Sequence, residues 1–334
     1  CDNYCPLTAE LEQGRLVGLR PYEDPKAICY KAHSYKEYIS HPDRILYPMK
    51  NLGRRGEQRW VRISWDQALG EIASKLQEII ARYGPESLAV SSLVGNCTGD
   101  QGMIRRFMNV LGSPNFISGV HMCAGNTFQV HRVTFGTTVG EDFETANCIL
   151  LVGHNPHKGN WAGQAAQIDA ALQRGAKLIV LDPRKSENAA RAHIHLPLRY
   201  GTDAAMLLGF LHVILEEKLY DPAFVAQYTY GFEQLKARAA EYPLSKVAAI
   251  TGCRAEEIAA AARMFATSGP SSIPWGPIPD MQVNSTSAIR CQDILMSVCG
   301  FVGKCEVLQC PMPNLVSVSE LELHEQLSPA QKAK

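Results

Sequence analysis

The sequence lacks several features that would place it directly in a class of protein. Its 334 residues include 33 basic and 33 acidic side chains, so there is no net charge to attract nucleic acid or an anionic membrane surface. The longest apolar run, residues 204–215, is too short to cross a bilayer and is interrupted by Gly209 and His212. We therefore expect no nucleic-acid partner and no membrane segment.

Common nucleotide-binding motifs and targeting signals are also missing. There is no G-x-G-x-x-G sequence and no P-loop, which argues against a nicotinamide dinucleotide or a nucleoside triphosphate. The chain begins at Cys1 rather than Met and shows no signal-peptide pattern, so we interpret it as a fragment or a processed chain. Its compartment is not encoded in these residues, although a cytoplasmic location is favoured.

The hydrophobic pattern of the central region predicts an α/β fold with a parallel sheet. Residues 147–153 and 176–184 have the pattern of buried strands, and residues 160–175 between them have that of a helix, so together they form a β-α-β unit. Further elements are expected in order: a strand in 194–198, a helix in 201–220 capped by Thr202 or Asp203, helices to about 267, a strand in 271–276 and a helix in 285–300. Residues 1–55 are turn-rich and predict little regular structure.

Three loops that follow predicted strands carry residues suited to a nucleotide. In an open α/β sheet, ligands bind beyond the carboxyl ends of the strands, and backbone N–H groups at a helix start suit a pyrophosphate. An acidic side chain there commonly binds ribose hydroxyls. Each loop alone could equally be a turn or a helix cap. The candidate cofactor-binding residues are Gly153, Asn155, Pro156, Asp182, Pro183, Arg184, Gly201, Thr202 and Asp203.

Cysteines near the N-terminus indicate a metal site. The chain has eleven cysteines but is too long for a small disulfide scaffold, and Cys1, Cys5 and Cys29 supply three soft thiolates close to one end. Thiolates select zinc, copper(I) or an iron–sulfur cluster, which usually needs four ligands. A zinc site completed by His33 and a cluster whose fourth ligand precedes residue 1 are equally compatible with this spacing.

A second cysteine site lies in the glycine-flanked stretch 119–136. Cys123 there has two interpretations: a small buried hydrophobic side chain, or a soft ligand for a metal ion. The residues around it do not distinguish the two.

Taken in order, these motifs resemble the molybdopterin oxidoreductase (dimethyl sulfoxide reductase) family. The stretch CDNYC…AICYK is similar to its N-terminal cluster motif, C-x2-C-x3-C followed after a long gap by C-x-K. The resemblance implies a [4Fe–4S] cluster on Cys1, Cys5 and Cys29, and Lys31 between cluster and pterin. It implies that Cys123 binds tungsten or molybdenum. It further implies molybdopterin guanine dinucleotide on the strand-end loops, two per full-length enzyme, with Asp203 against a guanine edge.

The resemblance also implies a domain plan. A small iron–sulfur domain would occupy residues 1–55, followed by the first part of one α/β domain in 56–118 and a doubly wound, dinucleotide-binding α/β domain in 119–310. Residues 311–334 would be a truncated connection, because the C-terminal barrel of the family is absent from this chain.

Long matching stretches, such as HPDRILYPMKN and LPLRYGTDAA, resemble hydratase members of the family, which add water to a carbon–carbon triple bond without net redox change. The resemblance implies that Asp2 is the active-site acid, since a partly desolvated carboxylate beside an anionic cluster favours its protonated form. It places Trp161 and Trp275 at the substrate pocket.

Three positions depart from that hydratase pattern, which has isoleucine where this chain has Asn3, Gly95 and Ala124. Loss of these side chains leaves room for a larger or wetter small-molecule substrate. Two alternatives remain open: a redox enzyme that passes electrons through the cluster to an electron-transfer partner, and a non-catalytic subunit or fragment with the same fold.

Overall fold

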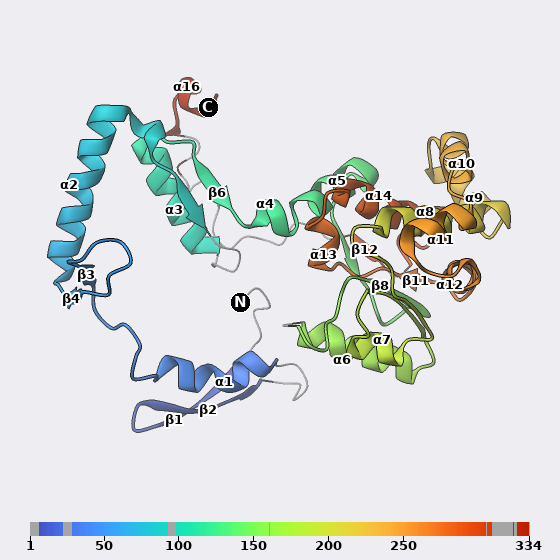
Figure 1. The fold of residues 1–334 in the computed structure, drawn as a ribbon, viewed down its shortest axis with the longest axis horizontal. Helices are drawn as coiled ribbons and strands as arrows, with labels where there is room; N and C mark the ends of the chain where they lie inside the picture. The colour runs from blue at the N-terminus through green and yellow to red at the C-terminus, as the bar shows by residue number, and fades with distance from the viewer. Residues whose placement is uncertain are drawn as a thin grey trace. The chain divides into compact units, whose positions relative to one another are not determined.

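The computed structural model describes residues 7–22, 29–92, 98–159, 161–304, 306–308, 323 and 326–333 (Figure 1). The chain divides into two compact units. The first comprises residues 1–22, 30–119 and 313–334, and the second comprises residues 23–29 and 120–312.

The first unit consists of short sheets and their adjoining helices. Its elements are β1 (Leu7–Glu12), β2 (Arg15–Pro21), α1 (Tyr30–Ile39), β3 (Met49–Asn51), β4 (Trp60–Arg62), α2 (Trp65–Tyr83), the 3-10 turn η1 (Pro85–Ser87), β5 (Val90–Ser92), α3 (Thr98–Leu111), β6 (Phe116–Ser118) and α16 (Pro329–Lys332). Strands β5 and β6 pair in parallel around α3, whereas β1–β2 and β3–β4 are antiparallel.

Helix α2 is capped at both ends. The Ser64 hydroxyl accepts a hydrogen bond from the Gln67 backbone N–H, and Gly84 follows the helix with a φ of 81°. The N-terminal region is more regular than expected, because β1 and β2 form a hairpin. Its two-residue turn uses positive φ angles at Gln13 and Gly14.

The second unit is a parallel α/β structure. In chain order its elements are α4 (Val120–Cys123), α5 (Gly125–Phe135), β7 (Val139–Glu141), β8 (Cys148–Val152), α6 (Ala162–Gln173), β9 (Lys177–Leu181), α7 (Glu187–Arg191), β10 (Ile194–Leu196), α8 (Asp203–Glu216), α9 (Pro222–Tyr228), α10 (Phe232–Ala240), α11 (Leu244–Thr251), α12 (Ala255–Thr267), β11 (Ser271–Ser272), α13 (Pro277–Asp280), α14 (Ser285–Val298) and β12 (Glu306–Leu308).

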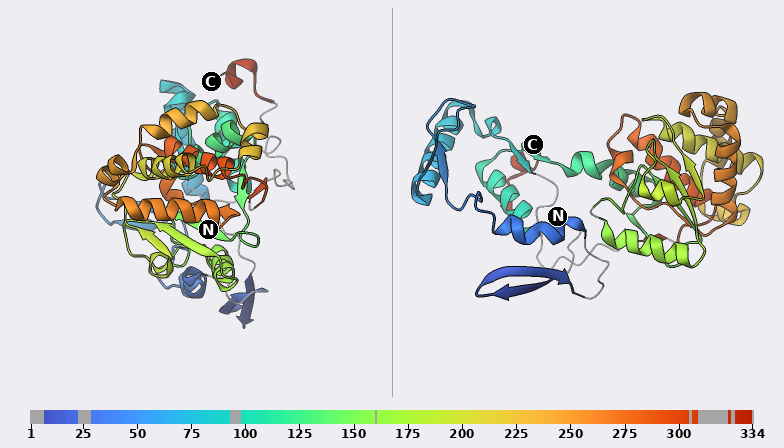
Figure 2. Two further views of the ribbon diagram at one scale, coloured as in Figure 1. Left: turned by 90° about the vertical axis from the view of Figure 1, so that its right-hand side faces the viewer. Right: turned by 60° about the horizontal axis from the view of Figure 1, so that its bottom comes forward.

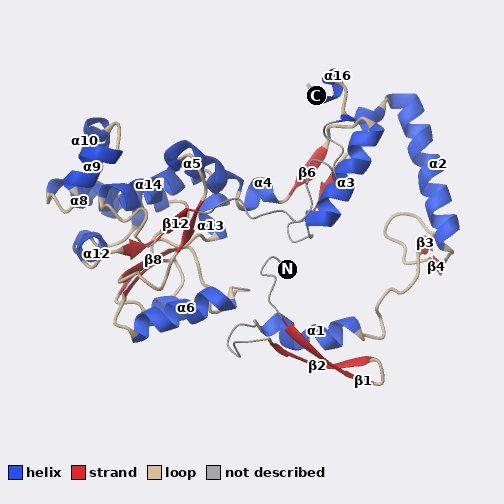
Figure 3. Cartoon of the chain, turned by 180° about the vertical axis from the view of Figure 1, so that it is seen from behind, coloured by secondary structure: helices blue, strands red, loops and turns tan. Residues whose placement is uncertain are grey.

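The main sheet of this unit has the strand order β10-β9-β8-β11, and every pairing is parallel. Every residue of β8 is buried, as expected for a strand covered on both faces. Helix α6 lies on one side of the sheet and α8, α12 and α14 lie on the other (Figures 2 and 3). The predicted β-α-β unit and parallel sheet are therefore confirmed.

Helix α8 forms the centre of the core. It contains the longest apolar run of the sequence, and this run is apolar because most of the helix is buried. It packs against α10, α11, α12 and α14, and its Phe210 and Leu211 are fully buried. Thr202 occupies the N-cap position, but its hydroxyl donates to the Arg199 carbonyl at 2.6 Å instead of capping the helix. In the described part of the chain, no helix combines the length and the apolar character that crossing a membrane requires.

Buried cysteines of the second unit should resist alkylation in the native protein. Burial raises the pKa values of the Cys148, Cys291 and Cys299 thiols to about 12 each. At pH 8 only about one such thiol in ten thousand is a thiolate, which is the reactive form. Peptide mass spectrometry after iodoacetamide treatment should find all three unmodified, whereas the denatured protein should react at each. Equal labelling of both samples would contradict this burial.

Candidate functional site

The order of the strands creates a crevice at the carboxyl ends of β8 and β11. The chain moves from β8 outward to β9 and β10, then returns to place β11 on the opposite side of β8. The connections on the two sides of β8 therefore run in opposite directions. The position where they diverge is the topological switch point, where open α/β sheets bind ligands. The loops that meet there begin at Gly153 and Ile273.

Two glycines allow these loops to approach each other closely. Gly153 has a φ of 56°, and a Cβ atom there would lie 2.9 Å from the side chain of Ile278. A Cβ atom at Gly276 would lie 2.7 Å from the Cβ of His154. The Gly153 backbone N–H also donates to the Leu181 carbonyl at 2.8 Å, which joins the ends of β8 and β9. Side chains at either glycine would force the crevice open.

Three aromatic rings line up along the switch point. The rings of Trp161 and Trp275 meet edge to face at a centroid distance of 5.4 Å, and His154 contacts Trp161 in the same manner at 6.0 Å. Edge-to-face packing suits the charge distribution of aromatic rings. The structure thus brings together the two tryptophans that the sequence predicted for the substrate pocket, and it adds His154.

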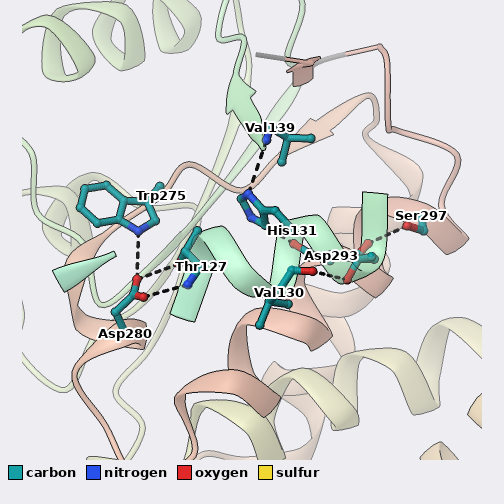
Figure 4. A network of polar contacts seen from close by, with 9 residues as sticks. Thr127, Val130, His131, Val139, Trp275, Asp280, Asp293 and Ser297 are labelled. Atoms are coloured by element: carbon teal, nitrogen blue, oxygen red, sulfur yellow. Dashed lines mark hydrogen bonds and ion pairs between the residues drawn. The ribbon is translucent and has the colours of Figure 1, made fainter. Parts of the chain in front are cut away.

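A buried carboxylate fixes Trp275 to helix α5. Asp280, which is 4% exposed, accepts hydrogen bonds from the Trp275 indole at 3.0 Å and from the backbone N–H and hydroxyl of Thr127 at 2.9 and 2.7 Å (Figure 4). Its backbone carbonyl accepts a further bond from Asn126 at 3.3 Å. One side chain therefore joins the loop after β11 to the first turn of α5.

Cys123 lies next to this anchor. It is half-buried at the end of α4, and only Ala124 separates it from the first residue of α5. Because Asn126 and Thr127 are held by Asp280, the chain that carries Cys123 is fixed relative to Trp275. Trp275 is thus connected through Asp280 to the helix that begins two residues after Cys123.

A second polar chain supports His154 from behind. Its ring Nε2 lies 2.7 Å from the Gln164 side-chain oxygen, and the Gln164 amide nitrogen donates to the Glu141 carboxylate. This orientation of the amide puts the His154 proton on Nε2. Burial raises the pKa of the Glu141 carboxyl, and hydrogen bonds from Gln164 and the Trp275 backbone partly offset that rise. Burial also lowers the pKa of His154 and favours its neutral ring.

The loop after β9 carries both buried acid and exposed base. Asp182 is 3% exposed and accepts a hydrogen bond from the Arg184 backbone N–H at 2.8 Å; its Oδ1 also lies 3.6 Å from Arg184 Nε, and the Arg184 side chain is 67% exposed. Asn155, from the loop after β8, donates to Glu187 at 2.9 Å and accepts from Asn188 at 2.6 Å, both at the start of α7. Side-chain hydrogen bonds therefore connect the loop after β8 to the start of α7.

Residues 201–203 form the start of α8. Gly201 has a φ of 75° in the turn that precedes the helix, and Asp203 is buried as its first residue. Burial raises the pKa of the Asp203 carboxyl, and the charge of Asp182 adds to that rise. Two buried acids from the predicted cofactor set thus lie near enough to influence each other.

Several predicted site residues cannot be located in this assembly. Cys1, Asp2, Asn3, Cys5 and Gly95 lie outside the described residues. Cys29 is half-buried just before α1, and Lys31 is exposed in its first turn. Among the described residues, no group of three or more His, Cys, Asp or Glu side chains is arranged to hold a metal ion. The predicted [4Fe–4S] ligation therefore remains a prediction.

Asp280, Gln164 and Glu141 were not predicted from the sequence. Asp280 and Thr127 are separated by 153 residues, and Gln164 and Glu141 by 23, so no local motif connects them. His154 is different, because it directly follows Gly153 in a loop that the sequence already predicts to bind the cofactor. Its position just beyond a strand could have identified it as a site residue.

The residues at the strand ends are suited to a nucleotide cofactor. The exposed Arg184 guanidinium matches phosphate, and Asp182 and Asp203 match the hydroxyl and amino donors of a nucleoside. The Gly153 backbone permits close approach of a ligand. The Cys123 thiol is a soft donor of the kind that molybdenum or tungsten in a sulfur environment accepts. The side chains present therefore fit a nucleotide-bearing metal cofactor.

A doubly wound parallel sheet with these strand-end loops defines the class of α/β proteins that bind nucleotide cofactors at a switch point. Comparison with known families narrows this class. The model of the molybdopterin oxidoreductase family matches residues 44–289, which is most of the chain. The chain belongs to the molybdopterin oxidoreductase family.

Individual relatives cover the chain almost completely. Acetylene hydratase of Syntrophotalea acetylenica is 52% identical over 100% of this chain and 47% of its own length. The solved structure of acetylene hydratase from Pelobacter acetylenicus matches 99% of the chain with a TM-score of 0.89 and 51% identity, again over 47% of that protein. The molybdopterin-containing subunit of thiosulfate reductase from Salmonella typhimurium is 32% identical over 82% of the chain and 36% of its own length. The chain thus spans less than half the length of these relatives.

Substitution of Gly153 should distort the crevice. In Gly153→Ala, the positive φ and the contact with Ile278 both oppose the new Cβ, so we expect a loss of about 1–3 kcal/mol in the free energy of unfolding. Thermal or denaturant unfolding measures this change. Gly163→Ala is a matched control, because Gly163 lies on α6 with no atom within 4 Å of its Cβ position. Equal stability of both variants would contradict the proposed close approach.

Loss of the Asp280 charge should loosen the assembly around Trp275. Asp280→Asn offers one oxygen to three donors, so at least one buried donor loses its partner, at about 1–3 kcal/mol. Thr127→Val removes one donor only and should cost less. The exposed Asp66→Asn serves as control. Unfolding midpoints that do not rank the Asp280 variant lowest would show that the carboxylate is not the anchor.

Proposed function

We propose that this chain is the cofactor-binding part of a hydratase that adds water to a carbon–carbon triple bond without net oxidation or reduction. The observation that carries the proposal is the 52% identity with acetylene hydratase over the whole chain. The packed pair Trp161 and Trp275, held to the segment that bears Cys123, supports it because an unsaturated hydrocarbon needs an apolar, rigid pocket wall.

The proposed cofactors are molybdopterin guanine dinucleotide, two in the full-length enzyme, with tungsten or molybdenum, and a [4Fe–4S] cluster. When bound, the pterin-held metal would supply a Lewis-acidic centre for the addition of water. In this proposal Cys123 is its protein ligand, and Cys1, Cys5 and Cys29 hold the cluster. Lys31 would offset the negative charge between the cluster and the pterin.

The strand-end loops would bind the dinucleotide. The Arg184 guanidinium is exposed and fits a phosphate, and the loop at Gly153 allows the backbone to approach one. Buried carboxyl groups at Asp182 and Asp203 would accept hydrogen bonds from the ribose and the guanine edge. The remaining candidates, Asn155, Pro156, Pro183, Gly201 and Thr202, would shape these loops; Asn155 already ties two of them together.

Within this proposal, Asp2 holds and transfers the proton. A protonated aspartate can donate a hydrogen bond to the reacting water, deliver its proton to the carbon that does not receive oxygen, and regain a proton from the water that adds. The aldehyde product then forms by tautomerisation of the enol. No electrons leave the site, so the cluster acts through its charge.

The substrate is proposed to be a small unsaturated molecule. Its pocket would be wider or more hydrated than one lined by isoleucine at positions 3, 95 and 124. Ala124, half-buried beside Cys123, presents only a methyl group. Each methylene group absent from a pocket wall removes about 0.8 kcal/mol of apolar contact. Alkynes larger than acetylene are therefore included in the substrate class.

Hydration without an electron acceptor tests the function. Full-length protein containing tungsten or molybdenum and iron should convert an alkyne to its aldehyde or ketone with no oxidant or reductant present. Asp2→Asn should keep its metals and lose about 10²–10⁴-fold in rate, the usual contribution of general acid–base catalysis. Turnover that requires an electron carrier would instead support the redox alternative. Iron without tungsten or molybdenum would support the non-catalytic one.

The metal-ligand role of Cys123 can be tested separately. Cys123→Ala should lower the tungsten or molybdenum content measured by mass spectrometry while iron remains. Cys253→Ala is a matched control, because that buried thiol lies between α11 and α12 outside the proposed site. Unchanged metal content and activity in Cys123→Ala would contradict the assignment.

A further inference from the structure

A small cavity with polar and apolar walls lies in the second unit, and Trp275 is one of its lining residues. It has a volume of about 30 Å³, and its walls come from α5, β7, the loop after β11 and α14. The residues used below are Thr127, His131, Glu141, Trp275, Gln292 and Asp293. A water molecule needs about 10–15 Å³ of such volume, together with two to four polar partners. The cavity therefore has room for at least one water molecule.

A contact between the His131 ring and the Asp293 side chain closes one side of the cavity. The His131 Nδ1 atom accepts a hydrogen bond from the Val139 backbone N–H at 3.4 Å, so the ring proton is on Nε2 (Figure 4). That Nε2 lies 3.3 Å from Asp293 Oδ1. Asp293 is 4% exposed and His131 is 9% exposed, so both groups are withdrawn from solvent.

Two side-chain atoms of residues that line the cavity have no hydrogen-bond partner among the described residues. Asp293 Oδ2 and Gln292 Nε2 are buried and make no hydrogen bond to any residue in the described part of the chain. One is an acceptor and the other is a donor. Buried polar atoms of this kind are nearly always satisfied, by protein or by ordered water.

The cavity has both hydrogen-bond donors and acceptors in its walls. It therefore favours a neutral ligand that can both donate and accept hydrogen bonds. A cation would face the amide protons of Gln292, and an anion would face the carboxylates of Asp293 and Glu141. Burial raises the pKa of Glu141, which adds a group that can also donate when protonated. Water satisfies all of these partners, and an ion does not.

We propose that this cavity binds one ordered water molecule, which accepts a hydrogen bond from Gln292 Nε2 and donates one to Asp293 Oδ2. Thr127 and His131 lie one turn apart on α5, and each is held by a buried carboxylate, Asp280 for the first and Asp293 for the second. The water completes the second of these contacts. It thereby helps to fix the helix that follows Cys123, and this role does not depend on which reaction the enzyme catalyses.

A high-resolution crystal structure of the full-length enzyme tests the site directly. We expect one well-ordered water peak within hydrogen-bond distance of both Asp293 Oδ2 and Gln292 Nε2. Absence of density in the cavity, or a peak whose coordination identifies a metal ion, would overturn the proposal.

A variant pair tests whether the water depends on the named atoms. Gln292→Leu should lose the water peak, and amide hydrogen exchange at Val139 should become faster because the His131–Asp293 pair is less constrained. Gln173→Leu makes the same change at an exposed position of α6 and should alter neither observation. Retention of the water in Gln292→Leu would refute the site. Should that variant fail to fold, the wild-type density still decides.

Discussion

One buried carboxylate, Asp280, joins the loop after β11 to the start of α5. It accepts three hydrogen bonds from two segments, the first turn of α5 and the indole of Trp275. Burying a carboxylate costs several kcal/mol, and three charge-assisted hydrogen bonds of about 1.5–3 kcal/mol each offset that cost. Loss of the carboxylate affects all three contacts, whereas loss of one donor affects one.

The rest of the site follows from this anchor and from the strand order. Because β11 pairs with β8, its following residues Trp275 and Gly276 lie against His154 and Trp161. The anchor then connects that aromatic wall to the chain bearing Cys123. Residues separated by about 150 positions in the sequence become neighbours only when α5, β11 and α13 pack together. The candidate metal ligand and the pocket wall thus form as one cooperative unit, which suits a reaction that needs fixed geometry.

The parts of this structure that the sequence predicts are those whose signals are local. Apolar runs at 148–152 and 177–181 form parallel strands. A strand that is covered on both faces has apolar side chains at nearly every position, so a continuous apolar run is enough to predict it. Gly153 and Asp182 directly follow the buried strands β8 and β9, and Asp203 begins α8, so their positions follow from the same local pattern. Interactions between distant segments could not be predicted, since nothing near Asp280 identifies Thr127 as its partner. Thr202 shows a subtler limit: its N-cap position is predictable, but its hydroxyl bonds to the preceding turn because Gly201 brings Arg199 within reach.

The choice of reaction depends on far fewer residues than the fold does. Acetylene hydratase and a thiosulfate reductase subunit both align with this chain, at 52% and 32% identity, so the cofactor-binding architecture is compatible with hydration and with redox chemistry. What distinguishes such reactions has to lie in the few side chains that meet the substrate, and Asp2 and Cys123 are proposed to be two of them. Ala124 lies between Cys123 and the first residue of α5, and its small side chain is a third proposed difference. A fixed backbone with variable side chains at so few positions is how one scaffold acquires new substrates without losing its cofactor.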